Sequence, residues 1–227
     1  QFFSVFNFKE FFKLKELVLV NVMVSVFFIG FNVYFAYMGN YIIHYLGYTA
    51  DMMGIIEAVP LVLAMLTAIP ISILINKNKN VPVTFFAIVV NVIGLLVIAP
   101  LKAADVDNTQ IFNLRIWLGI FLVGVGYVAI LQVTKVWTKQ LYPQDSKGQF
   151  EGIWILFFVL IPMIGGSLIG ERVVKTSGET FVDAASGQMQ YIPNGNIFSV
   201  GAVIVALTVI PAIFAAKQYK KRLSEGK

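Results

Sequence analysis

Long uninterrupted runs of apolar residues dominate the chain, and short polar stretches separate them. The hydrocarbon core of a bilayer is about 30 Å thick, so a spanning helix needs about 20 mostly apolar residues. Six runs reach this length, and none of them alternates polar and apolar residues as the strands of a membrane β-barrel do. The pattern therefore predicts an all-α membrane protein whose six helices span about 17–46, 52–75, 81–100, 112–136, 150–172 and 197–216.

The segments outside these runs have their own patterns. Residues 1–16 mix Phe with Lys, which is typical of an amphipathic lead-in lying at the membrane interface, although a frayed polar linker fits equally well. Residues 217–227 form a basic tail. The long loop from Glu171 to Asn196 contains Gly-rich turn signals, and its segments 180–182 and 189–192 are expected to pair as a small hairpin.

Composition and charge agree with a membrane protein and set its expected orientation. The chain is 58% hydrophobic and 13% charged, whereas a soluble domain is about a quarter charged. If the N-terminus is cytoplasmic, 13 of the 17 Lys and Arg residues fall on the inner side, as membrane topology requires. We therefore expect an integral protein of the cell membrane with both termini cytoplasmic. These cations leave no basic face for nucleic acid.

The six predicted helices fall into two triplets with similar middle members. The sequence Gly54-Ile-Ile-Glu57 opens the second helix, and Gly148-Gln-Phe-Glu151 opens the fifth. Each is followed inside its helix by a proline, Pro70 and Pro162 respectively. Because these two helices run in opposite directions, the pattern is what an inverted three-plus-three repeat would produce, although so short a match also arises by chance.

Two stretches of the chain resemble a known transporter family. Trp137 to Gly152, continuing through Ile-Leu-Phe-Phe-Val-Leu-Ile to Pro162, resembles the loop between helices ten and eleven of major facilitator superfamily transporters. Gly30 to Tyr37 and Tyr45 to Gly47 are similar to helix seven of that superfamily. The resemblance is greatest to the glycoside–pentoside–hexuronide:cation symporters, the group of the melibiose carriers, although an Arg is usual there in place of Lys147.

The resemblance implies a fold and a function. The chain would be the C-terminal half of a twelve-helix major facilitator fold, and a missing N-terminal six-helix half would be its partner. The substrate would be a small polar solute, a sugar or glycoside, moved with a coupling cation (Na⁺ or H⁺) by alternating access across the lipid bilayer. The sequence contains no Gly-x-x-x-x-Gly-Lys-Ser/Thr motif for ATP, in agreement with an ion-driven mechanism.

Three residues of the first predicted helix are candidates for binding substrate. In the resembled fold this helix lines the central cavity, where the amide of Asn32 and the hydroxyls of Tyr34 and Tyr37 could bond sugar hydroxyls. Aromatic rings can also stack on the apolar face of a sugar. A purely structural role fits as well, because Asn side chains join neighbouring membrane helices by hydrogen bonds.

Five charged residues are candidates for coupling or gating. Glu57 is a carboxylate inside the second predicted helix, where it could carry a proton or lie in an outer aqueous vestibule. Lys135 lies near the inner end of the fourth helix and could act in a gate or anchor the helix at the membrane surface. Asp145, Lys147 and Glu151 could form a cytoplasmic latch that breaks and reforms.

Other functional classes find little support in the sequence. The chain has no Cys and one His, which argues against metal or thiol chemistry, and we expect neither an enzyme nor a cofactor. The alternative to a transporter is a self-contained six-helix channel or structural membrane protein. A channel should carry a ring of like residues or a re-entrant filter, and no such pattern is evident.

Overall fold

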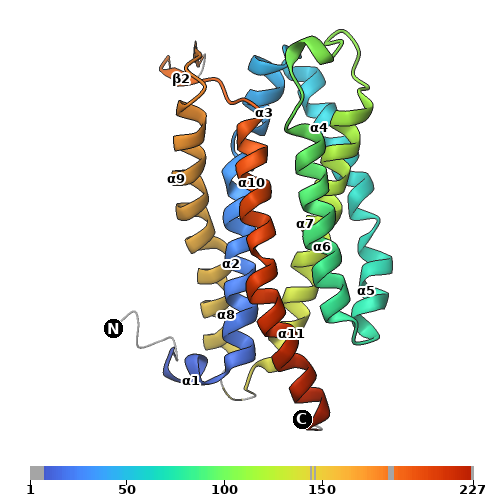
Figure 1. Cartoon of the computed structure of the whole chain (residues 1–227), viewed down its shortest axis with the longest axis vertical. Coiled ribbons are helices and arrows are strands. Elements are labelled where there is room, and N and C mark those ends of the chain that lie inside the picture. Colours follow the sequence, from blue (N-terminus) through green and yellow to red (C-terminus); the bar gives the residue numbers. More distant parts are fainter. Residues whose placement is uncertain (1–7, 144, 146, 184–186, 226–227) are drawn as a thin grey trace.

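The computed structural model describes residues 8–143, 145, 147–183 and 187–225. Within them, six helices are long and apolar enough to span a membrane, which confirms the predicted number and indicates an integral membrane protein. We call these helices spans 1 to 6, and they run alternately up and down in one bundle (Figure 1). Their bounds are Lys15–Tyr45, Ala50–Asn76, Asn80–Ile98, Leu114–Leu141, Lys147–Lys175 and Asn196–Ser224.

Several spans consist of more than one helical segment. Span 1 comprises α2 (Lys15–Phe35), α3 (Met38–Asn40) and a π-helical turn η2 (Tyr41–Tyr45); span 2 comprises α4 (Ala50–Met65) and α5 (Ala68–Asn76). Spans 3 and 4 are the unbroken helices α6 (Asn80–Ile98) and α7 (Leu114–Leu141). Span 5 comprises α8 (Lys147–Ile155), a π-helical turn η5 (Leu156–Leu160) and α9 (Ile161–Lys175); span 6 comprises α10 (Asn196–Leu207) and α11 (Val209–Ser224).

The smaller elements lie at the two ends of the bundle. Helix α1 (Phe8–Lys13) lies beside the start of α2, at the end we call the basic end (Figure 1). At the other end, the hairpin end, β1 (Thr180–Val182) pairs antiparallel with β2 (Met189–Tyr191), which confirms the predicted hairpin. A 3₁₀ turn, η3 (Ala103–Asp105), lies in the connection between spans 3 and 4.

Prolines explain the breaks in spans 2, 5 and 6. A proline inside a helix lacks an N–H and clashes with the carbonyl four residues earlier. Helix α4 ends at Met65, just before Pro70, and α10 ends at Leu207, just before Pro211. In span 5 the π-helical turn η5 precedes Pro162. Span 1 is segmented after Phe35 without a proline, and Pro60 lies inside α4 without ending it.

Span 1 satisfies a carbonyl that the proline of span 5 leaves free. The N–H of Ile161 donates to the carbonyl of Leu156, a spacing of five residues, so the next carbonyl, that of Phe157, would need the N–H of Pro162. Proline has no N–H, and the hydroxyl of Ser25 in α2 donates to the Phe157 carbonyl instead, at 2.5 Å. This bond fixes the kinked part of span 5 to the centre of the bundle.

The two triplets, spans 1–3 and spans 4–6, are interleaved. Span 1 packs mainly against spans 5 and 6, and span 4 packs mainly against spans 2 and 3. Spans 3 and 6 meet through α6 and α10, and spans 1 and 4 meet through α2 and α7. The first helix of each triplet is therefore buried against the second and third helices of the opposite triplet.

Glycines allow the closest of these contacts. Gly30 of α2 lies so near α10 that a Cβ built on it would be 2.8 Å from the Val205 side chain and 3.0 Å from the Gly201 carbonyl oxygen. A Cβ built on Gly94 of α6 would be 2.8 Å from the carbonyl oxygen of Gly119 in α7. Small residues at such crossings let two backbones approach each other inside a membrane.

Candidate functional site

Spans 2 and 5 are the least covered helices of the bundle. Only 22% of the most apolar stretch of each is buried, compared with 61% for span 1 and 56% for span 4. Span 2 lies on span 4, and span 5 lies on span 1. On the face between spans 2 and 5, partly exposed aromatic and charged side chains come from spans 1, 4 and 5. These side chains form the candidate site.

A row of aromatic side chains crosses from span 5 to spans 1 and 4. The Trp154 ring stacks on Phe158 with centroids 4.4 Å apart, and Phe158 meets Phe28 edge to face at 4.6 Å. Phe28 in turn contacts Tyr127 at 5.6 Å, and Tyr127 contacts Phe31 at 5.0 Å. We call these five residues the aromatic row. Phe28 is buried and Phe158, Tyr127 and Phe31 are half-buried, so part of the row is accessible.

Lys135 and Glu151 form an ion pair at one end of the aromatic row. The Lys135 ammonium donates to Oε1 of Glu151, which joins span 4 to span 5. The same ammonium lies 3.7 Å from the centroid of the Trp154 ring, in cation–π geometry. The side chains of Lys135 and Glu151 are 29% and 36% exposed, respectively. The structure thus directs the Lys135 ammonium toward the neighbouring span 5.

Tyr34 borders a pocket between spans 1, 2 and 4. The pocket has a volume of about 240 Å³, and its lining includes Tyr34, Phe31, Leu61 and Tyr127. The Tyr34 side chain is buried, and its hydroxyl lies beside the Asn91 side chain of span 3. Tyr34 and Tyr127 both line this pocket, and the sequence reasoning missed Tyr127.

Asn32 and Tyr37 lie on a different side of span 1 from Tyr34. The Asn32 amide donates to the carbonyl of Phe28 in its own helix, at 2.7 Å, and its Cβ lies against Gly166 of α9. The Tyr37 ring lies against Gly170, also in α9. Both residues pack at the contact of spans 1 and 5, so the structure separates the three predicted substrate residues into two groups.

Glu57 lies in α4 near the hairpin end and faces α3. Its Oε1 atom is buried and has no hydrogen-bond partner among the described residues. A Cβ built on Gly39 would be 3.9 Å from this oxygen. A carboxylate without a partner inside a spanning helix is costly, which keeps Glu57 a candidate for carrying a proton or a cation.

The three residues of the predicted latch are not all joined. Glu151 pairs with Lys135 of span 4, whereas Asp145 and Lys147 are exposed, and no ion pair between those two is found in the described part of the chain. Lys147 and Glu151 border a pocket of about 400 Å³ together with Tyr142. Tyr142 lies just beyond the end of span 4, where burial raises the pKa of its hydroxyl.

Sequence reasoning missed a second charged cluster, which is more buried. Glu16 of α2 is 9% exposed and accepts bonds from Arg222 of α11, from Nε at 2.9 Å and from Nη2 at 3.2 Å. The indole N–H of Trp137 in α7 also donates to Glu16, at 2.6 Å. Glu16 therefore ties together spans 1, 4 and 6. Its partners are far away in sequence, and no local pattern indicated them.

Comparisons of the chain with protein-family models, with curated proteins and with solved structures each gave no match.

Proposed function

We propose that this chain is one six-helix half of a secondary active transporter, and that the face between spans 2 and 5 borders its substrate path. The substrate class is a small polar solute, a sugar or glycoside, as the resemblance to cation symporters implies. A second six-helix bundle would cover the face and complete the path. Transport would follow from one bundle rocking against the other while the substrate stays bound between them.

The interleaved packing of the two triplets carries this proposal. Span 1 packs on spans 5 and 6, and span 4 packs on spans 2 and 3, so exchanging the triplets leaves the pattern of contacts unchanged. An inverted three-plus-three repeat has this symmetry. In such repeats the binding site lies where the two halves of the transporter meet, near the middle of the membrane.

The exposed chemistry of the face supports a polar substrate. The aromatic row offers ring faces for stacking on a sugar, and the half-buried Tyr127 offers a hydroxyl for a hydrogen bond within it. The Lys135–Glu151 pair lies at the end of this row. A charged pair facing lipid would be unfavourable, which favours a covering bundle or a water-filled path over this face.

Coupling to a cation would involve Glu57 or the Lys135–Glu151 pair. Glu57 provides a carboxylate oxygen without a partner among the described residues, on the hairpin end of span 2. Glu151 could exchange Lys135 for a proton or a cation when the two bundles move, because a partly exposed ion pair contributes only about 0–1 kcal/mol and separates easily. Asp145 and Lys147 stay candidates for contacts with the covering bundle.

An uptake assay tests the proposal directly. The full-length protein would be reconstituted in proteoliposomes, and uptake of labelled sugars would be measured with imposed Na⁺ or H⁺ gradients. We expect gradient-driven uptake that falls at least roughly tenfold in Lys135→Met, the size of effect expected when one charged group in a transport path is lost. Lys139→Met removes an exposed cation from the same helix and serves as the control.

Three results would contradict the proposal. Uptake that is absent with every sugar under both gradients rejects the substrate class. A conductance that needs no gradient coupling favours the channel alternative. Equal losses in Lys135→Met and Lys139→Met would mean that the pair at the aromatic row has no special role in transport.

A further inference from the structure

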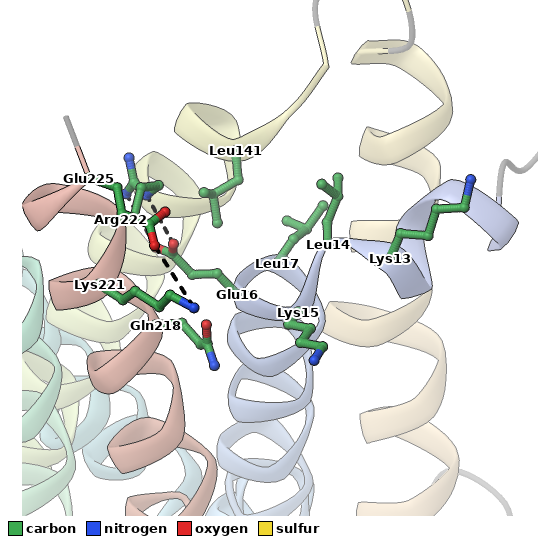
Figure 2. A pocket seen from close by; sticks show the side chains of 10 residues that line it. All are labelled: Lys13, Leu14, Lys15, Glu16, Leu17, Leu141, Gln218, Lys221, Arg222 and Glu225. Carbon is green, nitrogen blue, oxygen red and sulfur yellow. Dashed lines mark hydrogen bonds and ion pairs between the residues drawn. The ribbon is translucent and has the colours of Figure 1, made fainter. Parts of the chain in front are cut away.

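A pocket at the basic end lies between α11 and the corner where α1 meets α2. Its volume is about 420 Å³, and Figure 2 shows the residues that line it. All these side chains except Leu141 come from segments near the two ends of the sequence. The lining residues are Lys13, Leu14, Lys15, Glu16, Leu17, Leu141, Gln218, Lys221, Arg222 and Glu225.

The charges around this pocket are not balanced. Four of its lining residues are cations and two are carboxylates. Glu16 is occupied by Arg222 and Trp137, and the Glu225 carboxylate lies 3.8 Å from the Lys221 ammonium. Lys15 makes no hydrogen bond or ion pair with any residue that the structure describes. Lys13 is paired with Glu10, Lys221 with Glu225 and Arg222 with Glu16, so Lys15 is the lining cation that the described residues do not neutralise.

The backbone adds to the attraction for an anion. Helix α2 begins in the pocket wall, and its N-cap residue, Leu14, makes no side-chain cap hydrogen bond to the N–H groups of the first turn, which also carries Glu16. These N–H groups and the helix dipole favour a negative group nearby. The helix end and the lysines thus act on the same site.

The position of the pocket relative to the spanning helices indicates where the anion comes from. The pocket lies at the ends of spans 1, 4 and 6, where a bilayer has its headgroups. Helix α1 next to it buries Phe11 against Phe150 and Phe157, while Phe12 is 63% exposed. An exposed Phe beside lysines is typical of a helix that lies in the membrane interface.

We propose that this pocket binds the phosphate of an anionic phospholipid headgroup, with Lys15 and Lys221 as its principal ligands. The bound lipid bridges α2 and α11, the first and last spanning segments of the chain. Free phosphate shares the same chemistry, and the test below separates the two sources. The site is independent of the proposed transport function, since its lining shares no residue with the aromatic row or with the Lys135–Glu151 pair.

Calorimetric titration of the purified full-length protein in neutral detergent tests this site. The probes are dioctanoyl phosphatidylglycerol, dioctanoyl phosphatidylcholine and inorganic phosphate. We expect phosphatidylglycerol to bind most tightly, because the choline cation of phosphatidylcholine is repelled by the same lysines. The double variant Lys15→Gln/Lys221→Gln should bind phosphatidylglycerol roughly 10- to 30-fold more weakly, as expected for two cations near a lipid phosphate.

A matched double variant controls for overall charge. Lys77→Gln/Lys220→Gln removes two exposed cations from the same end of the bundle but outside the pocket lining, and should change the affinity less than about threefold. Equal weakening in both double variants would overturn the proposal, as would equal binding of the two lipids. Inorganic phosphate binding as tightly as phosphatidylglycerol would reject the lipid as the source. All the substituted lysines are exposed, so both variants should fold.

Discussion

Two clusters of the same composition lie at the basic end of the bundle and differ in burial. Each contains a carboxylate, a cation and a tryptophan: Glu16 with Arg222 and Trp137 in one, Glu151 with Lys135 and Trp154 in the other. In the first the indole N–H donates to the carboxylate, whereas in the second the indole ring lies under the cation.

The Glu16 cluster, which is more buried, connects its spans more firmly than the more exposed Glu151 cluster does. Glu16 is 9% exposed and receives three hydrogen bonds from two other spans, so separating its partners leaves a buried charge unpaired. Glu151 is 36% exposed and joins only spans 4 and 5, so water can replace its partner at little cost. The first cluster fits a structural role, and the second fits a gate between states.

The largest effect is expected from Glu16→Gln, which removes the charge but keeps the shape. Arg222 would remain largely buried without a carboxylate, and we expect the free energy of unfolding to fall by about 2–3 kcal/mol, somewhat less than for a fully buried pair. Unfolding by SDS titration in mixed micelles measures this value. A loss no larger than that of Glu151→Gln would remove the contrast between the clusters.

The two tryptophans provide a matched pair of substitutions. Trp137→Phe removes a hydrogen bond to a charged group and should cost about 1.5 kcal/mol in the free energy of unfolding. Trp154→Phe should cost less, because the Trp154 indole N–H has no hydrogen-bond partner within the described residues and Phe keeps an aromatic face for Lys135. The same SDS titration compares them, and the reverse order would contradict the assigned roles.

Ser25→Ala tests how firmly span 5, which carries Glu151, is attached to span 1. Loss of the bond to the Phe157 carbonyl should lower the free energy of unfolding by about 1 kcal/mol, since that carbonyl would then lack a donor. Ser72→Ala is the control, because the Ser72 hydroxyl bonds only a carbonyl of its own exposed turn. Equal effects in the SDS titration would mean that the kink does not depend on Ser25.

The smallest effect on stability is expected from Glu151→Gln. The partly exposed pair with Lys135 should contribute less than about 1 kcal/mol to the free energy of unfolding. Gradient-driven uptake should nevertheless fall in this variant, because the pair lies at the end of the aromatic row. A large stability loss with normal uptake would make the second cluster structural and leave the gate unidentified.

Local sequence patterns were enough to predict the class of fold, the number of spans and the pairing of strands 180–182 and 189–191. Hydrophobic length and turn residues are local properties, so the runs, the prolines that break them and the paired strands could be read before any contact was known. The sequence also singled out Lys135 and Glu151, since charges stand out beside long apolar runs.

Which of these residues meet depends on how the spans pack against one another. Glu16 bonds Trp137 and Arg222, which are 121 and 206 residues away, and the aromatic row combines residues of three spans. Helical periodicity separates Asn32 from Tyr34 but places Tyr37 on the side of Tyr34. Helix α2 ends at Phe35, and the structure places Tyr37 with Asn32 against span 5 instead. In a membrane nearly every side of a helix is apolar, so sequence hydrophobicity does not identify the packed face.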